Sequence, residues 1–248
     1  MSKLKFSFIS FLIVFFVSVA SLEGMENKKQ VLIDIAHNPV FWNDPQDMES
    51  KDYNQLERVK YLTQQLIQSI SPFHADIGYI KKQIGSADLD NCDVLFIHVP
   101  KAKYGQQEID AVQRYLDSGG SLFLVMDVDS WSSLDETNVN DIIKPYDIQY
   151  SGTSPDSLSG GYTVKGINTE KTLKIPYHGG RIIKGGTPLC FSRQTKEYPF
   201  GVYKELKSGG KLVVMGDGMP SLYMNSWEDI NDYQCQEFMK DVFKWLLE

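Results

Sequence analysis

The feature that most constrains the fold of this chain is the stretch 93–127, in which one amphipathic segment separates two apolar runs. The runs at 94–97 (VLFI) and 121–126 (SLFLVM) are nearly unbroken, which is typical of strands covered on both faces in a parallel sheet. The segment 106–116 places apolar residues at helical spacing, and a pair of glycines follows it. Strand, helix and strand in this order form the repeating unit of a parallel α/β sheet.

The rest of the chain continues this alternation. Further apolar runs lie at 30–36 and 211–215, and amphipathic helices are predicted at 53–70 and 231–247. The pattern predicts an α/β fold with one doubly wound, mostly parallel sheet of five to seven strands. Short β-like pieces at 162–207 predict a β-rich insert that adds antiparallel strands at an edge of the sheet.

The first residues have the pattern of a secretory signal peptide. Two lysines precede an apolar run at 6–19, and the run closes on a small-x-small pattern that ends at Ala20. We therefore expect a signal peptide at 1–20 and a single secreted or periplasmic domain at 21–248. The run is shorter than the roughly 20 residues that a membrane-spanning helix needs. No stable membrane insertion is expected after cleavage, and an uncleaved anchor is the alternative.

Charge and cysteine content narrow the classes of partner and cofactor. The formal net charge is -7, and this acidic balance argues against nucleic acid, which requires clustered Lys and Arg. Cys92, Cys190 and Cys235 are too few for a disulfide scaffold, although one bridge plus a free thiol stays open. None of them has the spacing of a metal site, so zinc bound through cysteine is not expected. The sequence names no metal and no cofactor, and we predict none.

Polar side chains follow several of the predicted strands, at the edge where open α/β sheets bind ligands. Histidines and carboxylates gathered there could bind a divalent cation, or could act as acid and base on a sugar. Each residue also has a structural interpretation, because Asp and His at strand ends often cap turns or satisfy loop hydrogen bonds. The candidate ligand-binding residues are His37, Asn38, His98, Asp127, Asp129 and Asp217.

Several of these segments together resemble a known superfamily. They are 93–97 (DVLFI), 108–112 (EIDAV), 115–122 (YLDSGGSL), 34–38 (DIAHN), 138–143 (NVNDII) with 146–148 (YDI), and 210–217 (GKLVVMGD). They resemble the class I glutamine amidotransferase-like superfamily, in particular a non-catalytic branch shared by intraflagellar-transport-type and ABC-transporter-associated (gliding-type) proteins. Trehalose-utilisation-like proteins share the central unit more distantly. The resemblance covers most of residues 30–225 and implies a flavodoxin-like sheet.

One departure from the superfamily pattern bears on function. Glutamine-hydrolysing members place a cysteine nucleophile on a sharp, glycine-flanked turn after a central strand, whereas this chain has Met126-Asp127-Val128-Asp129 there. The resemblance therefore implies an exported, non-catalytic domain that binds a small ligand, such as a carbohydrate, or an envelope protein. The alternatives are a carbohydrate-acting hydrolase that uses the strand-end carboxylates and histidines, and a structural component of a transport or motility assembly.

Overall fold

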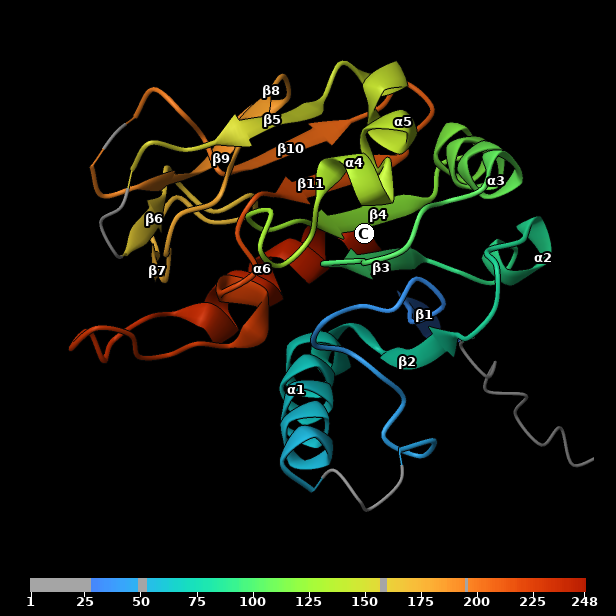
Figure 1. Cartoon of the computed structure of the whole chain (residues 1–248), viewed down its shortest axis with the longest axis horizontal. Helices are drawn as coiled ribbons and strands as arrows, with labels where there is room; N and C mark the ends of the chain where they lie inside the picture. The colour runs from blue at the N-terminus through green and yellow to red at the C-terminus, as the bar shows by residue number, and fades with distance from the viewer. Residues whose placement is uncertain (1–27, 49–52, 157–159, 195) are drawn as a thin grey trace, which may run out of the picture.

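The structure is a computed structural model that describes residues 28–48, 53–156, 160–194 and 196–248 (Figure 1). The predicted signal peptide at 1–20 lies outside these residues. Within the described ranges, no helix combines the length and the apolar character needed to cross a membrane.

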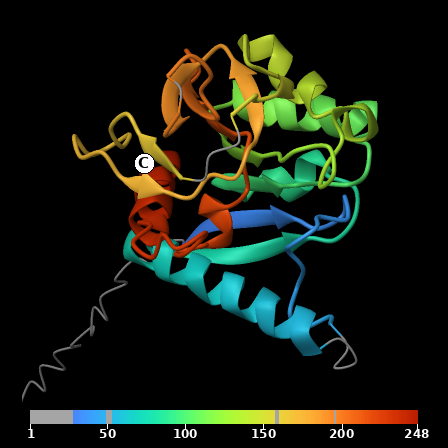
Figure 2. The same ribbon diagram turned by 60° about the vertical axis from the view of Figure 1, so that its left-hand side comes forward.

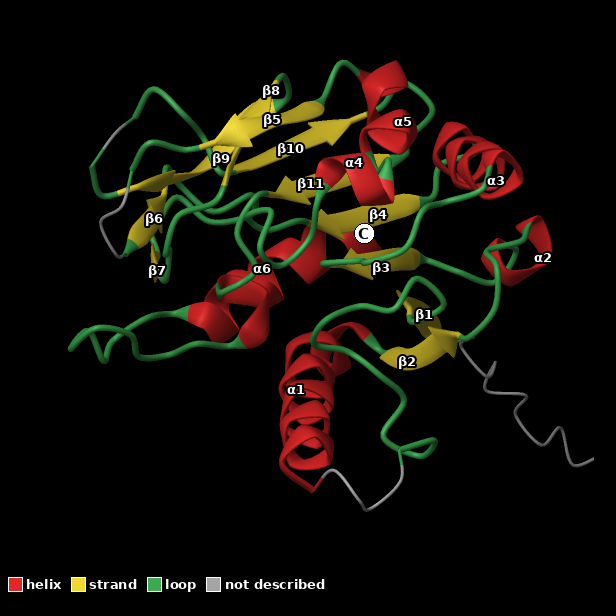
Figure 3. Ribbon diagram, viewed as in Figure 1, coloured by secondary structure: helices red, strands yellow, loops and turns green. Residues whose placement is uncertain are grey.

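A nine-stranded sheet forms the centre of the described structure, in the order β2-β1-β3-β4-β11-β10-β9-β6-β7 (Figure 3). Its first five strands pair in parallel, and their order is that of flavodoxin-like folds, which reverses between β1 and β3. The prediction of an α/β fold with a mostly parallel central sheet is therefore confirmed. The five parallel strands are β2 (Ala75–Ile80), β1 (Lys29–Asp34), β3 (Val94–His98), β4 (Ser121–Val125) and β11 (Lys211–Met215).

The remaining strands are antiparallel and lie beside β11. They are β10 (Gly201–Glu205), β9 (Thr187–Ser192), β6 (Gly161–Thr163) and β7 (Lys174–Ile175), while β5 (Gln149–Thr153) and β8 (Arg181–Lys184) form a separate two-stranded sheet. The predicted count of five to seven strands was too low, because strands as short as β6 and β7 show no readable periodicity. We predicted that the segment 162–207 is an insert relative to similar folds, and this stays a prediction.

Two layers of helices cover the sheet, and its side chains alternate between them. Phe96 and Phe123 pack in one apolar cluster with α1 (Tyr53–Ile70) and α6 (Cys235–Leu247). Leu95 and Leu122 pack on the other face with α3. Figures 1 and 2 show α1 in cyan well apart from α3 in green. The other helical segments are α2 (Ser86–Leu89), α3 (Gln106–Asp117), α4 (Leu134–Thr137), α5 (Asn140–Ile143), η1 (Ser71–Phe73), η2 (Lys144–Tyr146) and η3 (Pro220–Leu222).

Candidate functional site at the carboxyl edge of the sheet

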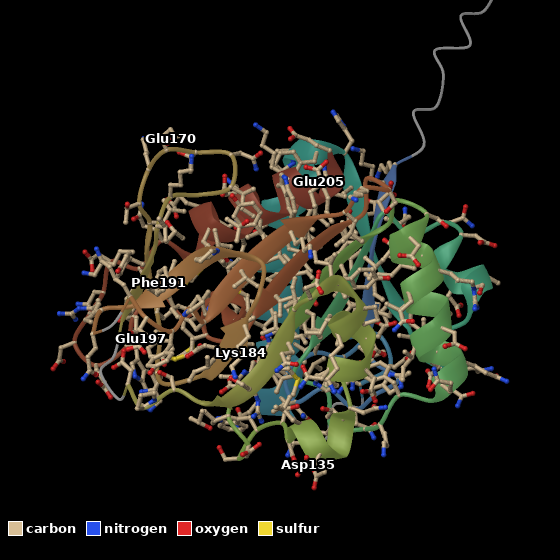
Figure 4. All side chains as sticks on the ribbon, turned by 90° about the horizontal axis from the view of Figure 1, so that it is seen from above. Asp135, Glu170, Lys184, Phe191, Glu197 and Glu205 are labelled. Atoms are coloured by element: carbon tan, nitrogen blue, oxygen red, sulfur yellow. The ribbon has the colours of Figure 1, made fainter. Side chains whose placement is uncertain are left out.

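The register of the parallel strands aligns the ends of β3, β4 and β11. His98 pairs with Val125, and Val125 pairs with Met215, so the residues that follow these strands emerge side by side. Asp127 and Asp217 each lie two residues beyond their strand. In Figure 4 the labelled Asp135, which comes after β4, marks the side of this edge. The labelled Glu205 lies on the opposite side of the molecule.

Asp127 and Asp217 are buried, and backbone amides occupy both carboxylates. Asp127 accepts hydrogen bonds from Val128 N at 2.7 Å and from Gly218 N at 3.1 Å. Asp217 accepts from His178 N at 2.9 Å and from Met219 N at 2.8 Å. Their side chains therefore cap the turns at the ends of β4 and β11.

Burial also changes the acidity of this pair. It raises the pKa of Asp127 to about 6, although hydrogen bonds from Val128 and Gly218 oppose the rise. Burial, and then the charge of Asp127, raise the pKa of Asp217 well above the usual carboxyl range. Two buried carboxyl groups that repel each other favour a protonated form near neutral pH.

His98 lies beside this pair and is held by a serine. Its Nε2 lies 2.9 Å from Ser221 Oγ, which in turn donates to Gly218 O at 2.8 Å. Ser221 therefore accepts the Nε2–H of His98, and the Nδ1 atom is left unprotonated. Among the described residues this buried Nδ1 has no hydrogen-bond partner. The rings of Phe41, Trp42 and Phe96 surround the imidazole.

The pair of Ser221 and His98 resembles a nucleophile with its base, but its environment argues against catalysis. Both side chains are 1% exposed, so a substrate cannot reach them. Burial lowers the pKa of His98 to about 3, which makes the imidazole a weak base. No carboxylate of the described chain orients its Nδ1, as a catalytic triad requires. Ser221 was missed from the sequence, because it lies in the 3-10 segment η3, further along the chain from the end of β11 than Asp217, and has no motif around it.

The backbone next to His98 is strained. Val99 has a φ of 44°, in the left-handed region that a β-branched residue rarely adopts. Hydrogen bonds hold this conformation on both sides, from Val99 N to Val125 O at 2.8 Å and from Val40 N to Val99 O at 3.2 Å. The turn after β3 is therefore fixed, and the loop from β1 is attached to it.

His37 belongs to a second buried cluster at the end of β1. Its Nδ1 lies 2.8 Å from Asp34 Oδ2, and its Nε2 lies 3.3 Å from Glu108 Oε1. Tyr104 stacks on the imidazole at 3.8 Å and donates to Asp34 Oδ2 at 2.7 Å. Burial alone would lower the pKa of His37, but the two carboxylates raise it above its usual value. Glu108 and Tyr104 were missed from the sequence, because both are distant from His37 along the chain.

The two remaining candidates lie at the surface. Asn38 is exposed and has a φ of 50°, a left-handed turn conformation that asparagine tolerates well. The side chain of Asp129 is 71% exposed and pairs with the buried Arg181 at 2.5 Å. Arg181 also donates to Ser132 O at 2.6 Å, so this residue, missed from the sequence, fixes the loop after β4 to β8.

The cysteines do not supply a nucleophile. Cys92, Cys190 and Cys235 are all free thiols. Burial raises the pKa of each, that of Cys92 to about 12, so the reactive thiolate form is rare at neutral pH. The turn 126–129 contains no left-handed residue of the kind found at a strained nucleophile turn. Within the described ranges, no group of three or more His, Cys, Asp or Glu residues is placed to hold a metal ion.

Two sequence comparisons match this chain to intraflagellar transport proteins. A family model described as the IFT52 GIFT domain matches residues 48–155. The human intraflagellar transport protein 52 homolog is 23% identical, with 68% of this chain and 46% of that protein covered. The chain therefore spans less than half the length of this relative. These matches fit the intraflagellar-transport branch of the predicted resemblance, while membership of the wider amidotransferase-like superfamily stays a prediction.

Solved structures extend the similarity to the fold. The mmIFT52 N-terminal domain superposes with a TM-score of 0.59 and 19% identity, covering 88% of this chain and 97% of that one. A ThuA-like protein from Parabacteroides merdae gives a TM-score of 0.54 and 9% identity, covering 88% and 89%. At these identities the likeness is one of fold alone.

The comparisons overturn two expectations. The expected secreted or periplasmic location is wrong, because the matching family model and the curated relative are both described as intraflagellar transport proteins. The expected envelope partner is wrong for the same reason. The matches also favour the structural-component alternative over an exported ligand-binding domain or a hydrolase.

Proposed function

We propose that this chain is a non-catalytic, protein-binding domain that acts as a structural component of a transport assembly of the intraflagellar type. The observation that carries the proposal is the match of residues 48–155 to the IFT52 GIFT domain model. The matched segment includes β3, α3 and β4, which build the carboxyl edge of the sheet. The relative is more than twice as long as the matched part of it, so the partners are part of the proposal.

The chemistry of the carboxyl edge supports this role. In this proposal His37, His98, Asp127 and Asp217 hold the turns of the edge together, because each is buried and bonded within the chain. Turnover would require an accessible nucleophile or base, whereas the cysteines are protonated and His98 is enclosed by aromatic rings. A rigid edge of this kind suits a binding scaffold.

The proposal is tested in ciliated cells that express the full chain with a fluorescent protein at its C-terminus. We expect the fusion to enter cilia and to move along them in discrete particles, whereas the fluorescent protein alone stays diffuse. A fusion that is secreted, or that stays diffuse outside cilia, would contradict the proposal. The purified chain should also release no product from a panel of glycosides. Hydrolysis of any of these glycosides would support the hydrolase alternative instead.

A further inference from the structure

A continuous aromatic and cationic surface lies outside the buried carboxyl edge. Trp131 and Tyr61 are 46% and 42% exposed, which is unusual for side chains of this size. The centre of the Trp131 ring lies 5.3 Å from the centre of the Phe41 ring. The guanidinium carbon of Arg58 lies over the same Phe41 ring, 4.6 Å from its centre. We name these four residues, Phe41, Arg58, Tyr61 and Trp131, the Arg58–Trp131 surface.

A hollow of about 490 Å³ adjoins this surface. Arg58, Tyr61 and Leu62 of α1 form one wall, and residues 222–226, which begin at the last residue of η3, form the other. Tyr61 OH donates to Tyr223 O at 3.4 Å, which connects the two walls. Exposed aromatic groups beside a hollow are the features that anchor partners in protein interfaces, where Trp, Tyr and Arg are enriched.

Trp131 is held in place by buried groups. Its amide donates to Val128 O at 2.9 Å, and the next residue, Ser132, donates through Oγ to Pro100 O at 2.5 Å. Arg181 binds Ser132 O from the other side at 2.6 Å. These hydrogen bonds fix the backbone that carries Trp131, so little backbone entropy is lost there when a partner covers the indole.

The charge of the surface indicates what the partner carries. Acidic residues outnumber Lys and Arg in the chain, 32 to 25. Nevertheless, none of the described residues that line the hollow is acidic. Within the described ranges the guanidinium of Arg58 has no carboxylate partner, and its recorded contact is with the Phe41 ring. An exposed guanidinium without an anion beside it is complemented by a carboxylate from a partner.

We propose that the Arg58–Trp131 surface binds a segment of a partner protein that presents a carboxylate to Arg58 and apolar side chains to Tyr61 and Trp131. This inference rests on the proposed function and names the surface through which it operates. A protein segment fits better than a small molecule, because the surface extends from the loop after β4 across to α1. It therefore offers separate anchors rather than one enclosed cavity.

The test uses phage-displayed random linear peptides as the probe and the full chain as the target. We expect the enriched peptides to carry Asp or Glu flanked by aromatic or aliphatic residues. A synthetic peptide of that type should lose about tenfold or more in affinity, measured by calorimetry, to Arg58→Glu and to Trp131→Ala. Arg114→Glu and Ile67→Ala, exposed positions outside the surface, are the matched controls and should bind normally.

A charge exchange makes the test specific. Replacing the acidic residue of the peptide with lysine should restore binding to Arg58→Glu and weaken binding to the wild type. If no peptide is enriched, or if enriched peptides bind Arg58→Glu as well as the wild type, the proposal is wrong. Concentration-dependent dimerisation that Arg58→Glu abolishes would assign the surface to a second copy and would also overturn it. Circular dichroism checks folding, with Arg58→Gln as the milder variant.

The failures of the two proposals are distinguishable. Peptide binding is measured on the purified chain, whereas entry into cilia is measured in cells. A wild-type fusion that enters cilia while the peptide selection fails refutes the surface alone. A fusion that never enters cilia refutes the transport role, whatever the selection gives.

Discussion

The imidazole Nδ1 of His37 lies 2.8 Å from Oδ2 of Asp34, and both side chains are buried where β1 ends. Because the other nitrogen of the ring faces Glu108, the protonated imidazole is bound on two sides. The cluster joins β1 to α3 across the point at which the strand order reverses. This is the position where other folds of this order bind a ligand.

The first prediction follows from the raised pKa of His37. A pKa that is higher in the folded than in the unfolded state adds stability below the unfolded value, near 6.5, and this contribution is lost as pH rises through the folded value. The free energy of unfolding lost in His37→Gln should therefore be larger at about pH 6 than at about pH 9. The loss at the lower pH should be about 3–5 kcal/mol, because two buried carboxylates lose their partner.

Chemical denaturation of wild type and variant at both pH values provides the measurement. The exposed His74→Gln is the matched control and should show no such dependence on pH. An equal loss for His37→Gln at both pH values would mean that the imidazole is neutral in the folded chain.

The second prediction concerns Asp127, whose pKa is also raised in the folded state. Its charged form is disfavoured there, so the wild type should lose stability relative to Asp127→Asn as pH rises from about 4 through about 6. The change should be at most about 3 kcal/mol, since one pKa unit corresponds to about 1.4 kcal/mol. Thermal unfolding across this range measures it, with the exposed Asp90→Asn as control. A constant difference between wild type and Asp127→Asn would contradict the raised pKa.

The third prediction concerns the unequal partners Arg181 and Asp129. Asp129 is largely exposed, and a surface ion pair would contribute little. Its partner is 2% exposed, however, so Asp129→Asn leaves a buried cation without its carboxylate. We expect a cost of about 1–3 kcal/mol, against about 0.5 kcal/mol or less for the exposed Asp135→Asn. Equal costs, measured by denaturant unfolding, would show that Arg181 does not depend on Asp129.

The fourth prediction concerns the thiols. Since burial raises the pKa of Cys92, Cys190 and Cys235, the native chain should react with a disulfide reagent about 100-fold more slowly than free cysteine at pH 8. All three thiols should react rapidly in denaturant. A single thiol that reacts rapidly in the native chain would contradict this prediction and would identify a candidate nucleophile.

The sheet was predictable because its parallel strands are continuous apolar runs. The runs at 94–97, 121–126 and 211–215 correspond to β3, β4 and β11. The rule that parallel strands end at one edge then placed His98, Asp127 and Asp217 together. The helix predicted at 231–247 begins later, at Cys235, because its apolar stripe does not extend to the preceding polar residues.

The contacts of the candidate site could not be predicted, because they join distant parts of the chain. Ser221 lies 123 residues from His98, and Arg181 lies 52 residues from Asp129. No linear spacing encodes such pairs. The burial of these side chains could not be predicted for the same reason. A polar residue after a strand has the same sequence pattern whether it faces solvent or lies under a neighbouring loop.

The η3 segment that holds Ser221 against His98 has one further consequence. It closes the carboxyl end of β3 with the chain's own residues, so that His98 is only 1% exposed. A cysteine introduced at position 127, where the present carboxylate is 8% exposed and accepts a hydrogen bond from Gly218 N, would therefore be enclosed by the chain rather than presented to solvent.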